Sequence, residues 1–315
     1  MLTRRVALAG LAAAMLRRRA AAKASQPATA VSFNVPTNAC DCHTHIFGDP
    51  KTFPLWPGRA YTPEPALPWE MSALHRALHM DRVVIVTPSV YGTDNSATLY
   101  GMKARGGNAR GVAVIDQDTP ETALDAMARA GICGVRINFV TAGQTGAAIA
   151  RERFRAAAAR IQRRNWHVQL FMGLALISAL KGLVQDALLP VVFDHFGGAQ
   201  AAVGLEQPGF ADLIELVRSG KAYVKISAAY RSSTQAPDYA DVTPFARALI
   251  AANPDRILWG TDWPHPNSTA RSITEAAPLL QIDDGRLLNQ LAVWAPDPAI
   301  RSKILVDNPA RLYGF

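Results

Sequence analysis

The chain has 315 residues, 49% of them hydrophobic, which is enough to bury one large core. No apolar run reaches the roughly 18 residues of a membrane-spanning helix. The net charge is +8, but six basic residues and no acidic one lie in residues 1–30, so the rest of the chain carries only +2. This balance gives little reason to expect a nucleic acid or a membrane as partner.

The first thirty residues have the pattern of an export signal. Thr3-Arg4-Arg5 precedes a short apolar run, and the A-x-A sequences 22–24 and 28–30 follow it. The paired arginines favour a twin-arginine signal peptide over residues 1–30 and therefore a periplasmic protein. The alternative is a basic tail that is not an export signal, which would leave the protein cytoplasmic. Residues 31–38, polar and containing proline, are predicted to be a linker.

From residue 39 to residue 315, segments rich in β-branched residues alternate with Ala- and Leu-rich stretches of helical period. This alternation is typical of successive βα units, and eight strands close a barrel. We therefore predict an α/β fold, a single-domain (β/α)8 TIM barrel over 39–315. The expected strands are 39–45, 82–89, 110–115, 134–139, 167–172, 190–196, 222–227 and 257–262, and helices are expected around 121–130, 148–164 and 210–219.

An open doubly wound sheet is the competing architecture, but no Gly-rich phosphate loop follows the first expected strand. Two segments, 47–68 and 264–298, are expected to be long and irregular. Each begins where a strand ends on a candidate catalytic residue. Because barrel active sites are built from the loops at the carboxyl ends of the strands, both segments are candidate parts of a lid or pocket.

The clearest chemical signal is Asp41-Cys42-His43-Thr44-His45 at the end of the first expected strand. Alternation along a strand places His43 and His45 on one face, with Cys42 and Thr44 on the other. Two imidazoles there can bind a divalent metal or polarise a carbonyl oxygen.

Two further groups fall at strand ends. His195 ends the sixth strand in Asp194-His195-Phe196-Gly197-Gly198, and Asp262 ends the eighth in Gly260-Thr261-Asp262-Trp263-Pro264. The carboxyl ends of barrel strands share one face, so the three histidines and Asp262 are predicted to meet there. We take them as the catalytic residues.

These motifs resemble the amidohydrolase superfamily (amidohydrolase-related family 2). More narrowly, the chain is similar to the branch of 2-pyrone-4,6-dicarboxylate hydrolase and D-galactarolactone isomerase. The segments 40–48, 89–95 and 134–138 and the closing Asn308-Pro309-Ala310-Arg311-Leu312-Tyr313 carry this likeness. The resemblance implies an enzyme, a hydrolase that acts on the ester bond of a small carboxylated lactone such as a pyrone or a sugar-acid lactone.

The resemblance also implies roles. Asp262 would be the general base that activates water, and His43, His45 and His195 would surround the carbonyl oxygen. Arg136 and Arg231 would bind the substrate carboxylate by charge-assisted hydrogen bonds. Tyr61, Ser89 and Tyr91 would be further substrate-binding groups.

No metal or other cofactor is expected to be required, because the fifth strand ends in Leu170-Phe171-Met172 without a ligand and the resembled branch works without metal. A single Zn²⁺ or Mn²⁺ on His43, His45 and Asp262 is the alternative. The expected partner is a small acidic lactone, and a homodimer is left open. The pyrone-dicarboxylate hydrolases also carry a second basic residue shortly after the strand-four arginine, whereas residues 139–145 here have none. This difference favours a lactone with one carboxylate, or a neutral sugar-type lactone, over the dicarboxylated pyrone.

Two other functions stay open. Related barrels are metal-dependent decarboxylases of aromatic or unsaturated acids and share the same histidine and aspartate positions. An exported binding protein on a catalytically inactive barrel is the third hypothesis, although retention of all three histidines and Asp262 weighs against it.

Overall fold

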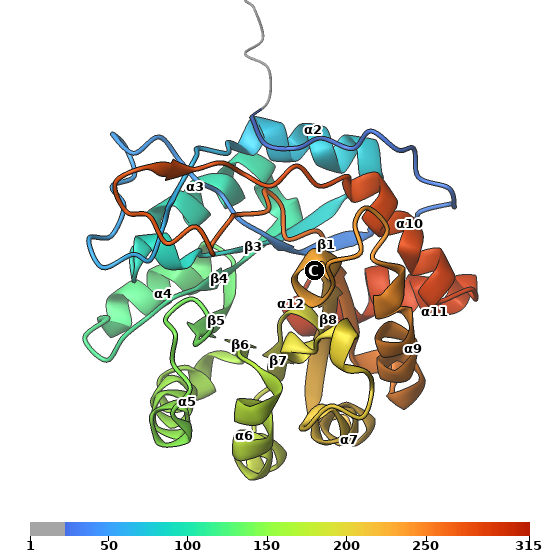
Figure 1. The fold of residues 1–315 in the computed structure, drawn as a ribbon. Coiled ribbons are helices and arrows are strands. Elements are labelled where there is room, and N and C mark those ends of the chain that lie inside the picture. The colour runs from blue at the N-terminus through green and yellow to red at the C-terminus, as the bar shows by residue number, and fades with distance from the viewer. Residues whose placement is uncertain (1–22) are drawn as a thin grey trace, which may run out of the picture.

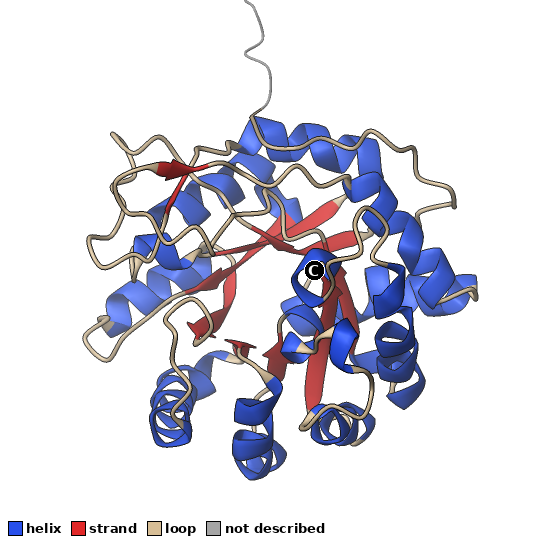
Figure 2. Ribbon diagram, viewed as in Figure 1, coloured by secondary structure: helices blue, strands red, loops and turns tan. Residues whose placement is uncertain are grey.

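The computed structural model describes residues 23–315, so the paired arginines and the apolar run of the expected signal peptide lie outside the described residues. Eight parallel strands form one sheet, with helices around it (Figures 1 and 2). The strands follow one another around the sheet in chain order: β1 (Cys40–Thr44), β3 (Arg82–Val86), β4 (Ala109–Ala113), β5 (Ile132–Asn138), β6 (His167–Phe171), β7 (Val191–Phe193), β8 (Ala222–Ser227) and β9 (Ile257–Gly260). The predicted (β/α)8 barrel is confirmed.

The barrel closes between β1 and the residues that follow β9. His45 donates its backbone N–H to the carbonyl of Trp263 at 2.8 Å, and Asp262 donates to the carbonyl of His43 at 2.8 Å. Asp41 reinforces this seam, because its carboxylate accepts from the backbone N–H and the hydroxyl of Thr261 at 3.0 and 2.7 Å. The seam therefore brings the two histidines of β1 next to Asp262.

The helices form the outer layer. Their apolar residues recur at helical spacing, as in α7, where Leu213, Leu216 and Val217 are buried. The three predicted helices are present as α4, α5 and α7. The helices are α2 (Pro68–Leu78), α3 (Ser96–Arg105), α4 (Glu121–Arg129), α5 (Ala147–Ile161), α6 (Leu174–Asp186), α7 (Phe210–Arg218), α8 (Ala229–Ser232), α9 (Thr243–Ala252), α10 (Asp284–Trp294), α11 (Pro298–Ser302) and α12 (Asn308–Tyr313). None of the helices in residues 23–315 is long and apolar enough to cross a membrane.

The two long segments meet each other. The first contains the short strand β2 (Thr62–Pro63), which pairs in parallel with β10 (Ala276–Ala277) from the second. The expectation that residues 264–298 are irregular throughout is wrong, because α10 occupies Asp284–Trp294. Asp283 caps this helix at Gly285 N, 3.0 Å away, and the helix is held by burial of its apolar face rather than by loop residues.

The interior of the barrel holds its own small cluster, which joins Cys40, Cys42 and the inward residues of the strands to Tyr313 near the C-terminus. The strict alternation expected on β1 is wrong. The register shifts between Asp41 and Thr44, and Cys42 packs in this interior cluster while His43 also turns inward to its partners on other strands. A bulge allows two successive side chains to face the same side of a strand.

The last residues of the expected signal peptide, from about residue 24, pack onto the barrel. Ser25 is buried, and its carbonyl accepts a 3.2 Å hydrogen bond from the indole N–H of Trp263. The hydroxyl of Thr29 donates to Asp283 at 2.6 Å. The chain is thus attached to the barrel from about residue 24 onward.

Candidate active site

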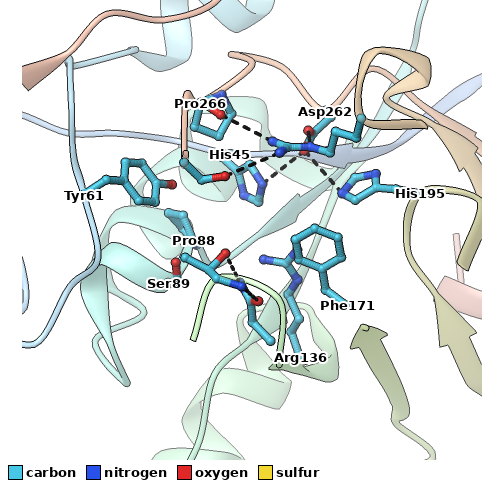
Figure 3. Close-up of a pocket in the computed structure, with 13 residues that line it drawn as sticks. His45, Tyr61, Pro88, Ser89, Arg136, Phe171, His195, Asp262 and Pro266 are labelled. Carbon is cyan, nitrogen blue, oxygen red and sulfur yellow. Dashed lines mark hydrogen bonds and ion pairs between the residues drawn. The ribbon is translucent and has the colours of Figure 1, made fainter. Parts of the chain in front are cut away.

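Asp262 is the centre of the site. Its Oδ1 atom faces the Nε2 atoms of the three histidines at the ends of β1 and β7. Figure 3 shows two of them, His45 and His195, beside Asp262. The distances are 3.5 Å for His43, 3.4 Å for His45 and 3.7 Å for His195. Its Oδ2 atom accepts hydrogen bonds from the hydroxyl of Tyr230 at 2.5 Å and from Nε of Arg231 at 2.7 Å. Oδ2 is thus engaged by two donors, whereas Oδ1 has no hydrogen-bond partner among the described residues.

The Nδ1 partners fix how each imidazole meets Asp262. His45 Nδ1 lies 2.7 Å from the carbonyl of Val86, which only accepts, so this nitrogen carries a proton and Nε2 is bare in the neutral ring. His195 Nδ1 lies 2.9 Å from the hydroxyl of Ser227, which can donate and so leave the proton on Nε2. The two rings therefore offer different chemistry, an acceptor from His45 and a donor from His195.

A layer of buried polar residues lies inside the barrel around His43. Its Nδ1 is 3.2 Å from Oδ1 of Asp194 and 3.3 Å from Nζ of Lys225. Lys225 also donates to Oε1 of Gln169 at 2.7 Å, and Asp194 Oδ2 accepts from Gln169 and from Nε of Arg136, each at 3.1 Å. Every one of these side chains is buried and has a polar partner, so the layer holds His43 rigidly.

Burial and the nearby arginines set the charges of the site. Burial lowers the pKa of His43 well below its ordinary value and that of His195 to about 4, so both are neutral at pH 7. Burial by itself would raise the pKa of Asp262, but the Arg231 guanidinium and the neighbouring histidines together outweigh it and hold this pKa well below its usual range. The site therefore combines an ionised Asp262 with two neutral imidazoles, those of His43 and His195.

A pocket lies above Asp262. Seven of the nine predicted site residues line it: His45, Tyr61, Ser89, Arg136, His195, Arg231 and Asp262. Figure 3 shows Tyr61 and Ser89 on the side opposite His195 and Phe171. His43 is fully buried and does not line the pocket, so it acts on Asp262 from within the barrel.

Two predicted substrate-binding residues have other roles in the structure. Tyr91 does not line the pocket, because its hydroxyl accepts the backbone N–H of Gly48 at 2.9 Å and fixes the loop after β1. Arg231 lines the pocket, but its Nε is taken by Asp262, and its terminal nitrogens lie 3.5 Å from Ser268 Oγ and 3.4 Å from the carbonyl of Pro266. Arg136 keeps only its Nε engaged by protein, among the described residues, and is the better ligand for a substrate carboxylate.

The donor set fits a divalent cation. His43, His195 and Asp262 each offer an atom within 4.8 Å of the others. His43 Nε2 and Asp262 Oδ1 are buried without a hydrogen-bond partner in the described part of the chain, which is what ligand atoms show before a cation binds. The set contains His195 in place of the expected His45. Closure of the barrel brings His195, at the end of β7, close to His43, with 4.6 Å between the two ring centroids.

Several residues of this site were not predicted from the sequence. Lys225 and Gln169 could have been, because a charged or amide residue in an otherwise apolar strand has to face polar partners when the barrel closes. Tyr230 could not, since a tyrosine next to an arginine in a loop has no distinctive pattern. The hydrogen bond from Tyr230 to Asp262 depends on how α8, the short helix after β8, lies against the end of β9.

Comparison with known proteins agrees with this geometry. The family model described as amidohydrolase matches residues 40–315. A 4-sulfomuconolactone hydrolase from Rhizobium radiobacter is 36% identical, covering 90% of this chain and 92% of the relative. A 2-pyrone-4,6-dicarboxylate hydrolase from Comamonas testosteroni is 34% identical, covering 89% and 92%.

A solved structure also shares the fold. An apo structure from Agrobacterium tumefaciens is 28% identical, has a TM-score of 0.76 and covers 92% of this chain and 98% of that chain. The match to the amidohydrolase family model extends over the whole barrel, from the first strand to the C-terminus. It includes the strand ends that carry His43, His45, His195 and Asp262. The chain therefore belongs to the amidohydrolase family.

Proposed function

We propose that this enzyme hydrolyses the ring of a small carboxylated lactone, with Asp262 as general base. The observation that carries the proposal is the difference between the two carboxylate oxygens of Asp262, a residue that lines the pocket: Oδ2 accepts hydrogen bonds from Tyr230 and Arg231, and Oδ1 has no hydrogen-bond partner among the described residues. The two curated relatives described above, by their names, both hydrolyse lactones or pyrones. Arg136 supplies the cation that a carboxylated substrate needs.

The chain's own residues account for each bond change. Asp262 Oδ1 takes a proton from a water molecule whose oxygen bonds to the lactone carbonyl carbon. His195 donates a hydrogen bond from its Nε2–H to the carbonyl oxygen as negative charge develops there, and it keeps its proton. The bond from that carbon to the ring oxygen then breaks, and the ring oxygen receives the proton from Asp262, which regenerates the base. The product is the ring-opened acid.

The other two histidines orient this machinery. The bare Nε2 of His45 accepts a hydrogen bond from the attacking water, because it lies 3.4 Å from Oδ1 of Asp262 on the pocket side. His43, which has its Nδ1 between Lys225 and Asp194, fixes Asp262 from below. The sequence predicted three histidines that all donate to one carbonyl oxygen. We propose instead that His195 donates to this oxygen, His45 accepts from the water and His43 supports Asp262.

A divalent cation is compatible with these residues but is not part of the proposed reaction. His43, His195 and Asp262 would hold it. When bound, it would polarise the carbonyl oxygen and lower the pKa of water. We propose that hydrolysis proceeds without it, because β6 contributes no ligand at its carboxyl end and Asp262 already has Arg231 and Tyr230 to stabilise its charge.

Metal content of the purified protein is the first test, with lactone hydrolysis measured before and after chelation. Metal-free protein that still opens lactones supports the proposal, and stoichiometric metal with activity lost on chelation contradicts the metal-independent step. Asp262→Asn should abolish hydrolysis. The control is Asp238→Asn, since Asp238 pairs with Arg286 at the surface and should leave the rate unchanged.

One alternative reaction is the metal-dependent decarboxylation of an aromatic or unsaturated acid. The metal-binding geometry of His43, His195 and Asp262 is compatible with it. Release of CO₂ in place of ring opening would identify it. The other alternative is a binding protein without catalytic activity. In that case the Asp262→Asn variant should bind the ligand as the unaltered protein does, and neither protein should turn it over.

We also infer export to the periplasm, with cleavage near the A-x-A sequence 22–24. The contacts of Ser25 with Trp263 and of Thr29 with Asp283 support this site over the one at 28–30, because cleavage after residue 30 would remove both contacts. The intact mass of the protein from a periplasmic extract tests the inference. A mature chain that starts after residue 30, or a full-length chain in the cytoplasm, would contradict it.

A further inference from the structure

The catalytic pocket has a second compartment. A neighbouring cavity shares Phe171, His195, Arg231, Pro266 and Ser268 with it. The cavity lies among the loops that follow β6, β7, β8 and β9. We call it the outer arm and define it by the residues that line it alone and carry the argument: Gly173, Gln200, Ser232, Asn267 and Thr269.

The outer arm has no cation free for a second anionic group. Arg231 is the only Lys or Arg among the described residues that line it, and each of its nitrogens is near a protein oxygen. Its charge is already opposed by Asp262 at 2.7 Å. A second carboxylate or sulfonate placed there would lose water without gaining an ion pair, and burial of an unpaired charge is costly.

The neutral side chains of the outer arm offer both kinds of hydrogen-bonding group. The amide nitrogen of Gln200 bonds to the carbonyls of Gly198, Ala199 and Arg231, which leaves its Oε1 as an acceptor. The Thr269 hydroxyl donates to Oδ1 of Asn267 at 2.8 Å, which leaves the Asn267 amide nitrogen as a donor.

Ser232 adds a hydroxyl to this set. It is 4% exposed, and its Oγ has no hydrogen-bond partner among the described residues. Donor, acceptor and hydroxyl together complement the hydroxyl groups of a substrate, each of which donates and accepts. An anionic group only accepts, and would meet the Gln200 oxygen unfavourably.

We propose that the substrate is a lactone with one carboxylate, bound at Arg136, and an uncharged hydroxylated substituent that occupies the outer arm, as in a sugar-acid lactone. This inference rests on the proposed lactone hydrolysis and specifies its substrate class. The dicarboxylated pyrone and the sulfonated lactone named for the relatives have a second anion and are expected to be poorer substrates here.

Gly173 allows the outer arm to be filled without disturbing the protein. A Cβ atom built on Gly173 meets no atom within 4 Å, and the residue has φ −86° and ψ 166°, which any side chain tolerates. Gly173→Leu would therefore extend into the arm. Gly182→Leu is the matched control, because Gly182 lies in α6, which Gly173 caps, also has open space at its Cβ and does not line the arm.

The experiment compares kcat/KM for three lactones: galactaric acid monolactone, 2-pyrone-6-carboxylate and 2-pyrone-4,6-dicarboxylate. The unaltered enzyme should prefer the galactaric lactone to the dicarboxylate. Gly173→Leu should lower kcat/KM for the galactaric lactone by about tenfold or more and leave the small monocarboxylate within about twofold, because only the former fills the arm. Gly182→Leu should change neither.

Preference of the unaltered enzyme for the dicarboxylate, or an equal effect of Gly173→Leu on both monocarboxylates, would overturn the outer-arm inference and leave lactone hydrolysis standing. Hydrolysis of none of the three would overturn the proposed function itself. A gain-of-function variant tests the charge argument independently. Asn267→Lys places a cation in the outer arm and should raise kcat/KM for the dicarboxylate, relative to that for the galactaric lactone, by about tenfold. An unchanged ratio would count against the charge argument.

Discussion

The hydroxyl of Tyr230 donates a 2.5 Å hydrogen bond to Oδ2 of Asp262, on the oxygen opposite the one that faces the three histidines. It shares this oxygen with Arg231, whose Nε lies 2.7 Å away. The two donors orient the carboxylate plane and leave Oδ1 toward the imidazoles. Tyr230 is therefore a positioning residue for the proposed base.

Tyr230→Phe should lower kcat by about tenfold, the cost expected when one of two donors on a catalytic carboxylate is lost. Loss of the donor also destabilises the ionised form, so the pKa of Asp262 rises and the acid limb of the kcat profile moves to higher pH. Steady-state kinetics between pH 4 and pH 8 check both effects. Tyr239→Phe is the control, because Tyr239 is buried in the apolar core. An unchanged acid limb would show that Tyr230 only fills space.

Arg136→Lys should raise KM for a carboxylated lactone by about tenfold to a hundredfold with a smaller change in kcat, because a lysine cannot reproduce the fork of the guanidinium. Arg136 stacks on Phe171 at 5.1 Å as well as lining the pocket. Arg153→Lys is matched, since Arg153 stacks on Phe139 at 5.2 Å away from the site. Equal loss on a lactone without a carboxylate would refute the substrate contact.

Lys225→Met should destabilise the protein by about 3–5 kcal/mol, because it leaves the fully buried Asp194 short of a partner. Urea unfolding followed by circular dichroism measures the loss. Lys303→Met provides the comparison, since the Lys303–Asp255 pair is half-exposed and should be worth less than about 1 kcal/mol. If the two variants lost the same stability, the interior polar layer would not be the support that its geometry indicates.

His167→Phe should make the protein less sensitive to acid. Neither imidazole nitrogen of His167 has a hydrogen-bond partner among the described residues, and burial lowers its pKa from 6.5 to about 3. The folded pKa lies below the unfolded one, so as pH falls from 6.5 toward 3 the unfolded chain takes up a proton that the folded protein does not. Stability then drops by up to about 1.4 kcal/mol per pH unit.

The phenylalanine variant lacks this proton uptake and keeps the ring contact with Tyr313. Its free energy of unfolding should therefore fall less between pH 7.5 and pH 4.5. The measurement at pH 7.5 is the internal control, because the His167 term is absent there. The same slope in both proteins would mean that His167 is protonated within the folded barrel.

The sequence by itself determined the barrel and where its chemistry lies. Strand and helix periods are local properties, and a parallel barrel places every strand's carboxyl end on one face, so His43, His45, His195 and Asp262 could be brought together before any coordinates. The same logic failed on β1, where one register shift turned Cys42 inward beside His43. It also failed on residues 284–294, where turn-forming residues nearby obscured a helix.

Only the tertiary structure decided what each group does. The carbonyl of Val86 makes His45 an acceptor, and the hydroxyl of Ser227 allows His195 to donate. Arg231, which looked like a substrate ligand, is engaged by Asp262. Protonation and hydrogen bonding depend on distances of about 3 Å between strands far apart in the chain, and no spacing within the sequence encodes such distances. The sequence thus named the candidate groups of the site, and the packing of strands and loops around them determined their hydrogen-bond partners.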